Sequence, residues 1–133
     1  MNAMPVDFNL TLRIDWENRT WVAVLSDALG NGKKLGEITG SVIALPDGRC
    51  AFVVDTAAME TAEGQVYRGR GVGREMYEMT IRRCLQHCDE FRSSGNTNEN
   101  SGGVWASLTR RYVNVRRAKG YWVVTRTDQE VLA

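Results

Sequence analysis

The sequence predicts one domain of mixed α/β (α+β) class, with a central, mostly antiparallel sheet flanked by helices. Three observations support this prediction. Residues 9–55 have the alternating and β-branched patterns of strands. Residues 72–91 change to the 3.6-residue period of an amphipathic helix, and residues 121–127 return to a β-branched and aromatic composition. A chain of 133 residues, 43% of them hydrophobic, is long enough for one hydrophobic core.

The first half of the chain is expected to contain only strands. They are predicted at residues 9–14, 21–25, 35–45 and 50–55. The connecting turns are predicted at residues 17–19, 31–34 and 46–48. Pro46-Asp47-Gly48 is the strongest turn signal, because proline presets one backbone angle and glycine accepts positive φ. The continuous apolar run at 51–54 predicts that the fourth strand is covered on both faces and lies inside the sheet.

The second half is expected to contain two helices and a final strand. The predicted elements are a loop at 57–65, a helix at 72–91, a loop at 93–103, a short strand at 104–106, a helix at 107–119 and a strand at 121–127. The first helix has one apolar face, made by Tyr77, Ile81, Cys84, Leu85, Cys88 and Phe91. The second is expected to begin after Ser107 as cap and to end at Gly120. Its apolar stripe is Leu108, Tyr112 and Val115.

A glycine- and arginine-rich segment lies between the fourth strand and the first helix. Residues 67–74 read YRGRGVGR, and the alternate glycines let the backbone approach a ligand closely. The first amides of the following helix lack intrahelical partners and lie at the positive end of its dipole, which favours a phosphate or pyrophosphate. The segment does not fit G-x-x-x-x-G-K-[ST], and Arg74 stands where G-x-G-x-x-G requires its third glycine.

The pattern that residues 67–74 do fit is R-x-x-G-x-G, at Arg68, Gly71 and Gly73. This segment resembles the acyl-CoA pyrophosphate loop of the GNAT superfamily of N-acetyltransferases. The strands before it, the helix after it and the ending Ala118-Lys119-Gly120-Tyr121 follow that family's order. The resemblance covers about residues 35–126 and is specific at 67–76.

The resemblance implies acetyl transfer from acetyl-CoA to an amine that attacks the thioester directly. The implied pyrophosphate-binding residues are Arg68, Gly69, Arg70, Gly71, Val72, Gly73 and Arg74. Backbone groups within 52–66 would bind the pantetheine arm. Arg110, Arg111, Arg116 and Arg117 are candidates for the adenosine 3′-phosphate or an acidic acceptor, and a solvated helix face is the simpler interpretation.

Catalytic candidates are the carboxylates between the fourth strand and the loop, and one tyrosine. Asp55, Glu60 and Glu63 are candidates for the general base. The family's tyrosine acid falls on Arg116, which cannot donate a proton near neutral pH. Tyr112, one turn earlier, is the alternative acid, although its place in the apolar stripe favours a core role.

The sequence departs from the family's pattern in two further places. The family opens with a strand and two helices that build the acceptor pocket, and this N-terminal half lacks the helix pair. About twelve residues separate Asp55 from Arg68 where the family has a handful, so either the fourth strand extends further or the connection carries an insertion. The acceptor amine is therefore left open by the sequence.

An uneven charge distribution supports a competing function. Residues 91–127 carry seven basic side chains and one acidic one, whereas the whole chain has a net charge of +1. With Trp105, Tyr121 and Trp122 nearby, this segment is also compatible with a module that binds nucleic acid or a protein partner. A catalytically degenerate GNAT-like protein is a further alternative.

The cysteines and the apolar runs bear on compartment and metal binding. Cys50, Cys84 and Cys88 form no disulfide framework, which favours a reducing compartment, the cytoplasm by default. Cys84 and Cys88 share the apolar helix face while His87 lies to its side, so they are interpreted as core residues and no metal is expected. No run of apolar residues is long enough to span a membrane. Residues 1–3 are candidates for an expression scar, and exposed edge strands make a homodimer an expectation.

Overall fold

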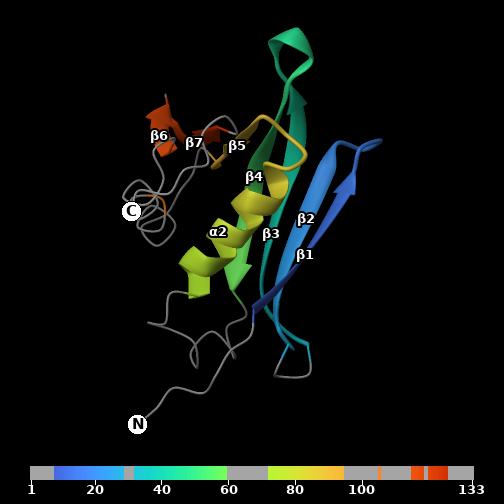
Figure 1. The fold of residues 1–133 in the computed structure, drawn as a ribbon, viewed down its shortest axis with the longest axis vertical. Coiled ribbons are helices and arrows are strands. Elements are labelled where there is room, and N and C mark those ends of the chain that lie inside the picture. The colour runs from blue at the N-terminus through green and yellow to red at the C-terminus, as the bar shows by residue number, and fades with distance from the viewer. Residues whose placement is uncertain are drawn as a thin grey trace.

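The described part of the protein is one sheet with the helix α2 against one of its faces (Figure 1). The computed structural model describes residues 8–28, 32–59, 72–94, 105, 115–118 and 120–125. The described elements are β1 (Phe8–Asp15), β2 (Thr20–Asp27), β3 (Lys33–Ala44), β4 (Cys50–Met59), α2 (Val72–Cys84), β5 (Glu90–Arg92), β6 (Val115–Ala118) and β7 (Tyr121–Thr125). The described strands form one sheet in the order β1-β2-β3-β4-β5-β7-β6. The predicted mixed α/β class is confirmed.

The first four strands form an antiparallel meander, as the sequence predicted. Asp15 closes the β1–β2 turn, because Oδ1 accepts the backbone N–H of Asn18 at 3.0 Å and Oδ2 accepts its side-chain amide at 2.8 Å. The β3–β4 turn is Pro46–Gly48, where Asp47 has φ 66° and Gly48 has φ 75°. β4 lies between β3 and β5, which confirms the prediction of an interior strand. It also extends four residues beyond Asp55, so residues 57–59 belong to β4 and not to the predicted loop.

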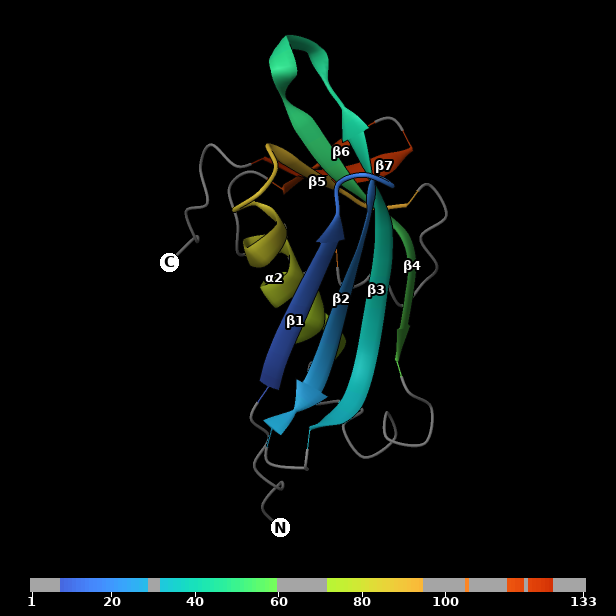
Figure 2. The same ribbon diagram turned by 90° about the vertical axis from the view of Figure 1, so that its right-hand side faces the viewer.

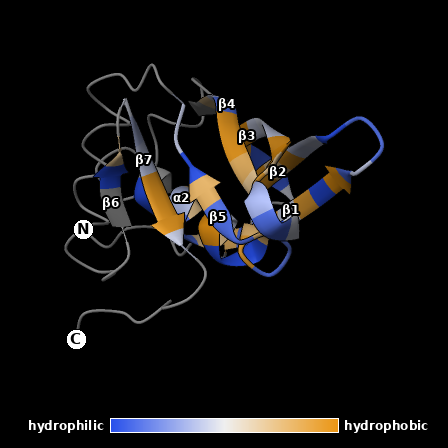
Figure 3. Ribbon diagram, turned by 90° about the horizontal axis from the view of Figure 1, so that it is seen from above, coloured by the Kyte–Doolittle hydropathy of each residue, from blue (hydrophilic) through white to orange (hydrophobic). Residues whose placement is uncertain are grey.

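The two faces of the sheet differ in what they contact. On the face toward α2, alternate strand residues are buried and form the core, including Leu10, Trp21, Leu25, Ile38, Phe52 and Val54. Trp21 stacks on Phe52, with ring centroids 5.8 Å apart. We call the other side the outer face; it carries Val22, Val24, Glu37, Thr39, Ser41, Ile43, Val53 and Asp55. Figure 2 shows α2 on one side of the strands only, and Figure 3 shows the polar and apolar alternation along β1.

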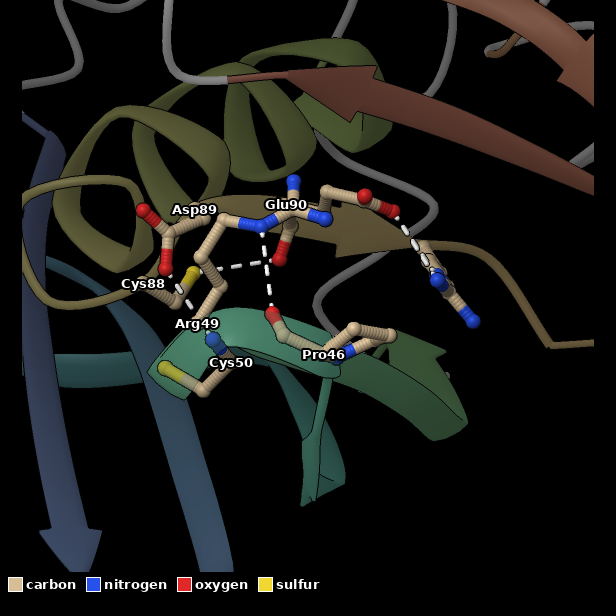
Figure 4. A network of polar contacts seen from close by, with 7 residues as sticks. Pro46, Arg49, Cys50, Cys88, Asp89 and Glu90 are labelled. Atoms are coloured by element: carbon tan, nitrogen blue, oxygen red, sulfur yellow. Dashed lines mark hydrogen bonds and ion pairs between the residues drawn. The ribbon is translucent and has the colours of Figure 1, made fainter.

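A pair of hydrogen bonds joins the start of β4 to the start of β5. The backbone N–H of Asp89 donates to the Cys50 carbonyl at 2.9 Å, and the Cys50 N–H donates to Asp89 Oδ2 at 3.0 Å. Figure 4 shows this junction, with Cys88 and Glu90 beside it; Cys88 Sγ lies 3.1 Å from the Glu90 carbonyl oxygen. From this point β4 and β5 run parallel.

The helix predicted over residues 72–91 is shorter than expected. α2 ends at Cys84, and helical turns continue to Cys88, whose N–H donates to the Cys84 carbonyl at 3.0 Å. This continuation keeps Cys84, Leu85 and Cys88 on one buried face although the helix has ended. Phe91 lies in β5 opposite Phe52, so its burial comes from strand pairing and not from the helical period.

The predicted second helix is wrong at its C-terminal end. Residues 115–118 form β6, which pairs antiparallel with β7 from Val115↔Val124 to Ala118↔Tyr121. Gly120, at φ 84°, lies in the turn between these strands and does not end a helix. Trp105 is helical and not in the predicted short strand, and residues 107–114 lie outside the described residues. The final strand is confirmed for 121–125.

Candidate functional site

β4 has strand partners on both sides over only part of its length. Its residues Ala51, Phe52 and Val53 pair with β5. From Val54 to Met59, the described residues supply no strand on the β5 side. Figure 1 shows β4 continuing past β5 toward the end of the sheet at which α2 begins. Within the described part of the chain, the backbone N–H and C=O groups on this side of Val54–Met59 have no strand partner, and such groups suit an extended ligand with amide groups of its own.

A β-bulge lies where β4 leaves β5. Thr39 pairs with Thr56, whereas the next residue of β3, Gly40, pairs with Val54, so Asp55 is an extra residue on β4. Gly40 permits this arrangement, because a Cβ there would clash with the Val53 carbonyl oxygen and with the Trp21 ring. Bulges redirect a side chain at the point where they occur. Here the bulge leaves Asp55 exposed on the outer face.

Two hydroxyl contacts hold the polar side chains around the bulge. The Ser41 hydroxyl donates to Asp55 Oδ2 at 2.7 Å, and the hydroxyls of Thr39 and Thr56 share a hydrogen bond. The Trp21 indole N–H donates to the Ser41 carbonyl at 3.1 Å. Trp21 is 1% exposed, so this hydrogen bond connects β3 at Ser41, the residue that contacts Asp55, to the core. Among the described residues, no side chain or backbone group donates to Asp55 Oδ1, which leaves this oxygen for a ligand.

A cavity of about 350 Å³ lies on the outer face beside this carboxylate. Its lining residues are Ser41, Ile43, Val53, Asp55, Arg92, Ser93 and Tyr121. They come from β3, β4, β7 and the end of β5, so the cavity lies where the pairing of β4 with β5 ends. Ile43 and Val53 supply apolar contact, while the carboxylate and the guanidinium supply opposite charges. A volume of this size is enough for a small polar molecule or one residue of a larger one.

Arg92 is held in place by two neighbours. Its Nε and Nη2 approach a single oxygen, Glu90 Oε1, at 3.1 and 3.0 Å. Its guanidinium carbon lies 5.1 Å from the centroid of the Tyr121 ring. The Arg92 side chain is 20% exposed. Ser93, which is 2% exposed, extends the β5–β7 contact, because its N–H donates to the Trp122 carbonyl and its Oγ accepts the Trp122 N–H.

Most site residues predicted from the sequence lie outside the described residues. These are Glu60, Glu63, Arg68, Gly69, Arg70, Gly71, Arg110, Arg111 and Tyr112. Val72 and Gly73 begin α2, and Arg74 is exposed in its first turn, with its Nε 4.0 Å from Glu78 Oε1. Arg116 and Arg117 lie in β6, so the predicted solvated helix face is wrong for these two. Asp55 is the predicted candidate that the structure brings into a cavity.

Sequence reasoning missed the other residues that line the cavity. Arg92 and Ser93 follow Phe91, which the helical period placed on a helix. The available signal was the alternation of polar Glu90 and Arg92 with buried Phe91 and Ser93, which is a strand pattern. A strand pattern of four residues is too short to outweigh a helical period of apolar residues that extends over 15 residues.

Cys84 and Cys88 are core residues, as the sequence predicted. Cys84 and Cys88 are 0% and 1% exposed. Burial raises the pKa of the Cys84 thiol, and burial also raises the pKa of Cys88 to about 12. His87 is exposed. Within the described ranges, no three His, Cys, Asp or Glu side chains are grouped as metal ligands.

Of the aromatic residues Trp105, Tyr121 and Trp122, the first is in the core and the other two are half-buried. Trp105 is fully buried, 5.7 Å from Tyr77 and 6.3 Å from Trp122 by ring centroids. Trp105 is therefore unable to stack on a nucleic-acid base, contrary to the competing interpretation. Arg117 lies over the Trp122 ring at 5.2 Å. In the described part of the chain, no helix combines the length and apolar character needed to cross a membrane.

The fold matches solved structures, although no family model and no curated protein sequence matches the chain. An acetyltransferase of the GNAT family from Staphylococcus aureus is 12% identical, with a TM-score of 0.54, covering 84% of this chain and 70% of that one. Glucosamine-6-phosphate N-acetyltransferase from Arabidopsis thaliana is 11% identical, with a TM-score of 0.52, covering 78% and 68%. The NatC complex bound to Gag peptide and CoA gives 18% identity, a TM-score of 0.55, and coverage of 83% and 72%.

At these identities the likeness concerns the fold. The chain has the fold of the GNAT acetyltransferases, which confirms the resemblance predicted from the sequence. The described residues of its first half, 8–28 and 32–59, form the strand meander without a helix pair, as expected.

Proposed function

We propose that the protein is an acyl-CoA-dependent N-acyltransferase that transfers acetyl from acetyl-CoA to an amine. The observation that carries this proposal is that β4 pairs with β5 over three residues only, and that among the described residues its edge from Val54 to Met59, which leads toward the start of α2, has no strand partner. Coenzyme A is an extended molecule with two amides in its pantetheine arm and a pyrophosphate beyond them. An unpaired strand edge and a helix N-terminus are suited to these two parts.

The coenzyme would bind with its pyrophosphate at residues 68–74 and its pantetheine arm along Val54–Met59. Unpaired amides at the start of α2 and the arginines of the preceding loop favour the pyrophosphate charge. Gly71 and Gly73 allow the backbone to approach it. The thioester would then lie near the bulge at Asp55, where β4 and β5 part.

The proposed reaction is a direct transfer. The acceptor ammonium first loses a proton to Asp55, directly or through water, and the free amine then attacks the thioester carbonyl carbon. The N–C bond forms, the C–S bond breaks, and CoA leaves as a thiolate that takes a proton. Asp55 is favoured as base because it lines the cavity and is oriented by Ser41. Glu60 and Glu63 stay alternative bases, and Tyr112 stays the candidate acid.

Calorimetric titration with acetyl-CoA tests the proposal. The wild-type chain is expected to bind, and Gly71→Glu is expected to abolish binding, because it adds a side chain and a negative charge where the pyrophosphate would lie. Thr11→Glu adds the same charge at an exposed position of β1 on the outer face of the sheet and is expected to bind normally. No measurable affinity of the wild-type chain for any acyl-CoA would overturn the proposal.

A further inference from the structure

We infer that the acceptor amine carries an anionic group, a carboxylate or a phosphate, and that Arg92 binds this group. The inference rests on the proposed N-acyltransferase activity and concerns the acceptor cavity alone. Asp55 and Arg92 contribute opposite charges to one cavity of about 350 Å³. A molecule whose ammonium group lies toward Asp55 and whose anionic group lies toward Arg92 is complementary to both charges.

Arg92 has an unused edge for such a ligand. Glu90 Oε1 accepts from Nε and Nη2, so one edge of the guanidinium is occupied. A guanidinium carries five N–H donors in a planar fork, and three of them have no partner among the described residues. The free edge, between Nη1 and Nη2, has the geometry that binds a carboxylate or phosphate through two parallel hydrogen bonds.

The surroundings of Arg92 restrict its movement. The Tyr121 ring lies against the guanidinium at 5.1 Å, and Glu90, whose side chain is 13% exposed, holds the other edge. Figure 4 shows the Glu90 carboxylate, with the dashed line that marks its ion pair. A guanidinium held at two sides loses little conformational entropy when a ligand binds, which strengthens recognition.

The charge balance of the cavity distinguishes acceptor classes. A polyamine is cationic along its length and would meet the Arg92 charge when one of its amines approaches Asp55. A neutral monoamine would leave the partly buried N–H groups of Arg92 without a ligand acceptor, which is unfavourable when water is displaced. An anionic amine satisfies both ends of the cavity.

Matched pairs of acceptors test the inference. The pairs are glucosamine 6-phosphate with glucosamine, and 5-aminopentanoate with 5-amino-1-pentanol. In each pair the amine is retained and the anion is replaced by a neutral group, so the ratio of the two kcat/KM values measures recognition of the anion. We expect the wild-type ratio to be roughly 10- to 100-fold in favour of an anionic amine. The pair with the larger ratio identifies phosphate or carboxylate as the ligand group.

Variants of the ion pair assign the preference to Arg92. Arg92→Gln is expected to bring the ratio to about one, and Arg92→Lys to an intermediate value, because lysine keeps the charge without the planar fork. Glu90→Gln is expected to raise the ratio, because it removes the negative charge that compensates the guanidinium. Arg49→Gln, an exposed arginine outside the cavity, is expected to leave the ratio unchanged. Because each ratio compares two substrates on one sample, partial unfolding of a variant does not alter it.

The outcomes separate this inference from the proposed function. Acetylation of all four amines with wild-type ratios near one overturns the inference and leaves the N-acyltransferase proposal standing. A ratio that is unchanged in both Arg92 variants also overturns it. If acetyl-CoA does not bind and no amine is acetylated, the proposed function fails, and the inference fails with it.

Discussion

The Ser41 hydroxyl donates a 2.7 Å hydrogen bond to Asp55 Oδ2, across the β-bulge where β4 leaves β5. Ser41 is in turn tied to the core through the Trp21 indole. An exposed carboxylate is thus oriented by a chain of contacts that begins at a fully buried ring. This orientation, together with the adjoining cavity, makes Asp55 the side chain on which the proposed chemistry depends most directly.

Asp55→Asn is expected to lower kcat roughly 10²- to 10⁴-fold, the usual contribution of a general base. The amide keeps the size of the side chain but cannot accept the ammonium proton. Affinity for acetyl-CoA, measured by calorimetry, should not change, because the carboxylate has no part in holding the coenzyme. Asp47→Asn, in the exposed β3–β4 turn, is the control and should retain full activity. Normal turnover by Asp55→Asn would transfer the role of base to Glu60 or Glu63.

Gly40→Ala is expected to destabilise the fold by about 3 kcal/mol, near the upper end of overpacking costs. The added methyl would clash with the Val53 carbonyl oxygen and the Trp21 ring, both fixed in the core. Gly48→Ala, where φ is +75° and space is open, should cost only about 1 kcal/mol of backbone strain. Urea denaturation of both variants provides the measurement, and equal losses would contradict the close approach at Gly40.

Asp89→Ala is expected to cost about 1–3 kcal/mol of stability, because the Cys50 N–H loses its acceptor at the β4–β5 junction. Asp89→Asn keeps a side-chain oxygen as acceptor at that position and should lose less stability than Asp89→Ala. Thermal unfolding of the two variants under one set of conditions gives the comparison. If the two variants have the same unfolding temperature, the hydrogen bond between Cys50 and Asp89 contributes little to the stability of the junction.

Cys50 is expected to be the thiol that reacts first in the native protein. It is half-buried, whereas Cys84 and Cys88 are buried and their thiol pKa values are raised by burial. At pH 8 both buried thiols therefore stay protonated and inaccessible. Labelling with a maleimide followed by peptide mass spectrometry should find one modified site, and three after unfolding. Native labelling of Cys84 at the rate of Cys50 would argue against the packing of α2.

The Asp15 carboxyl is expected to titrate below its ordinary value of 3.8. The Asn18 backbone N–H is the main cause and the Asn18 side-chain amide the second, because both stabilise the ionised form and so lower the pKa. The stabilisation is therefore present above the unfolded pKa and is lost as pH falls through the folded one. NMR titration should show a higher Asp15 pKa in Asn18→Ala and no change in Asn9→Ala. An unchanged value in Asn18→Ala would exclude a contribution from the side-chain amide.

Two segments whose local pattern fits both a helix and a strand differ from the structure predicted for them. Residues 115–118 suit a helix by spacing, yet they pair with β7, where Val115 is the strand partner of Val124 and Arg117 lies over Trp122. Phe91 fits the apolar face of a helix and also a short strand opposite Phe52. In both cases the partner is supplied by another part of the sheet, and periodicity within one segment does not detect it.

The candidate site was predictable to the extent that its residues follow each other in the chain. The phosphate-loop pattern at 68–73 and the carboxylate of Asp55 were found from spacing and position. The cavity was not, because Ser41, Val53, Arg92 and Tyr121 come from four strands. Their proximity depends on the strand order and on the bulge at Asp55, which no single segment encodes.

The sequence by itself determined the mixed α/β class, the β1–β4 meander with its β1–β2 and β3–β4 turns, and the apolar face of α2. These features depend on hydrophobic period and turn residues, which act between near neighbours in the chain. Only the tertiary structure decided where α2 ends, that residues 90–92 and 115–118 are strands, and which side chains meet beside Asp55. Those outcomes depend on hydrogen bonds between strands that are distant in the chain. The backbone N–H and C=O groups of a strand need partners, and the sequence of one segment does not show which other segment supplies them.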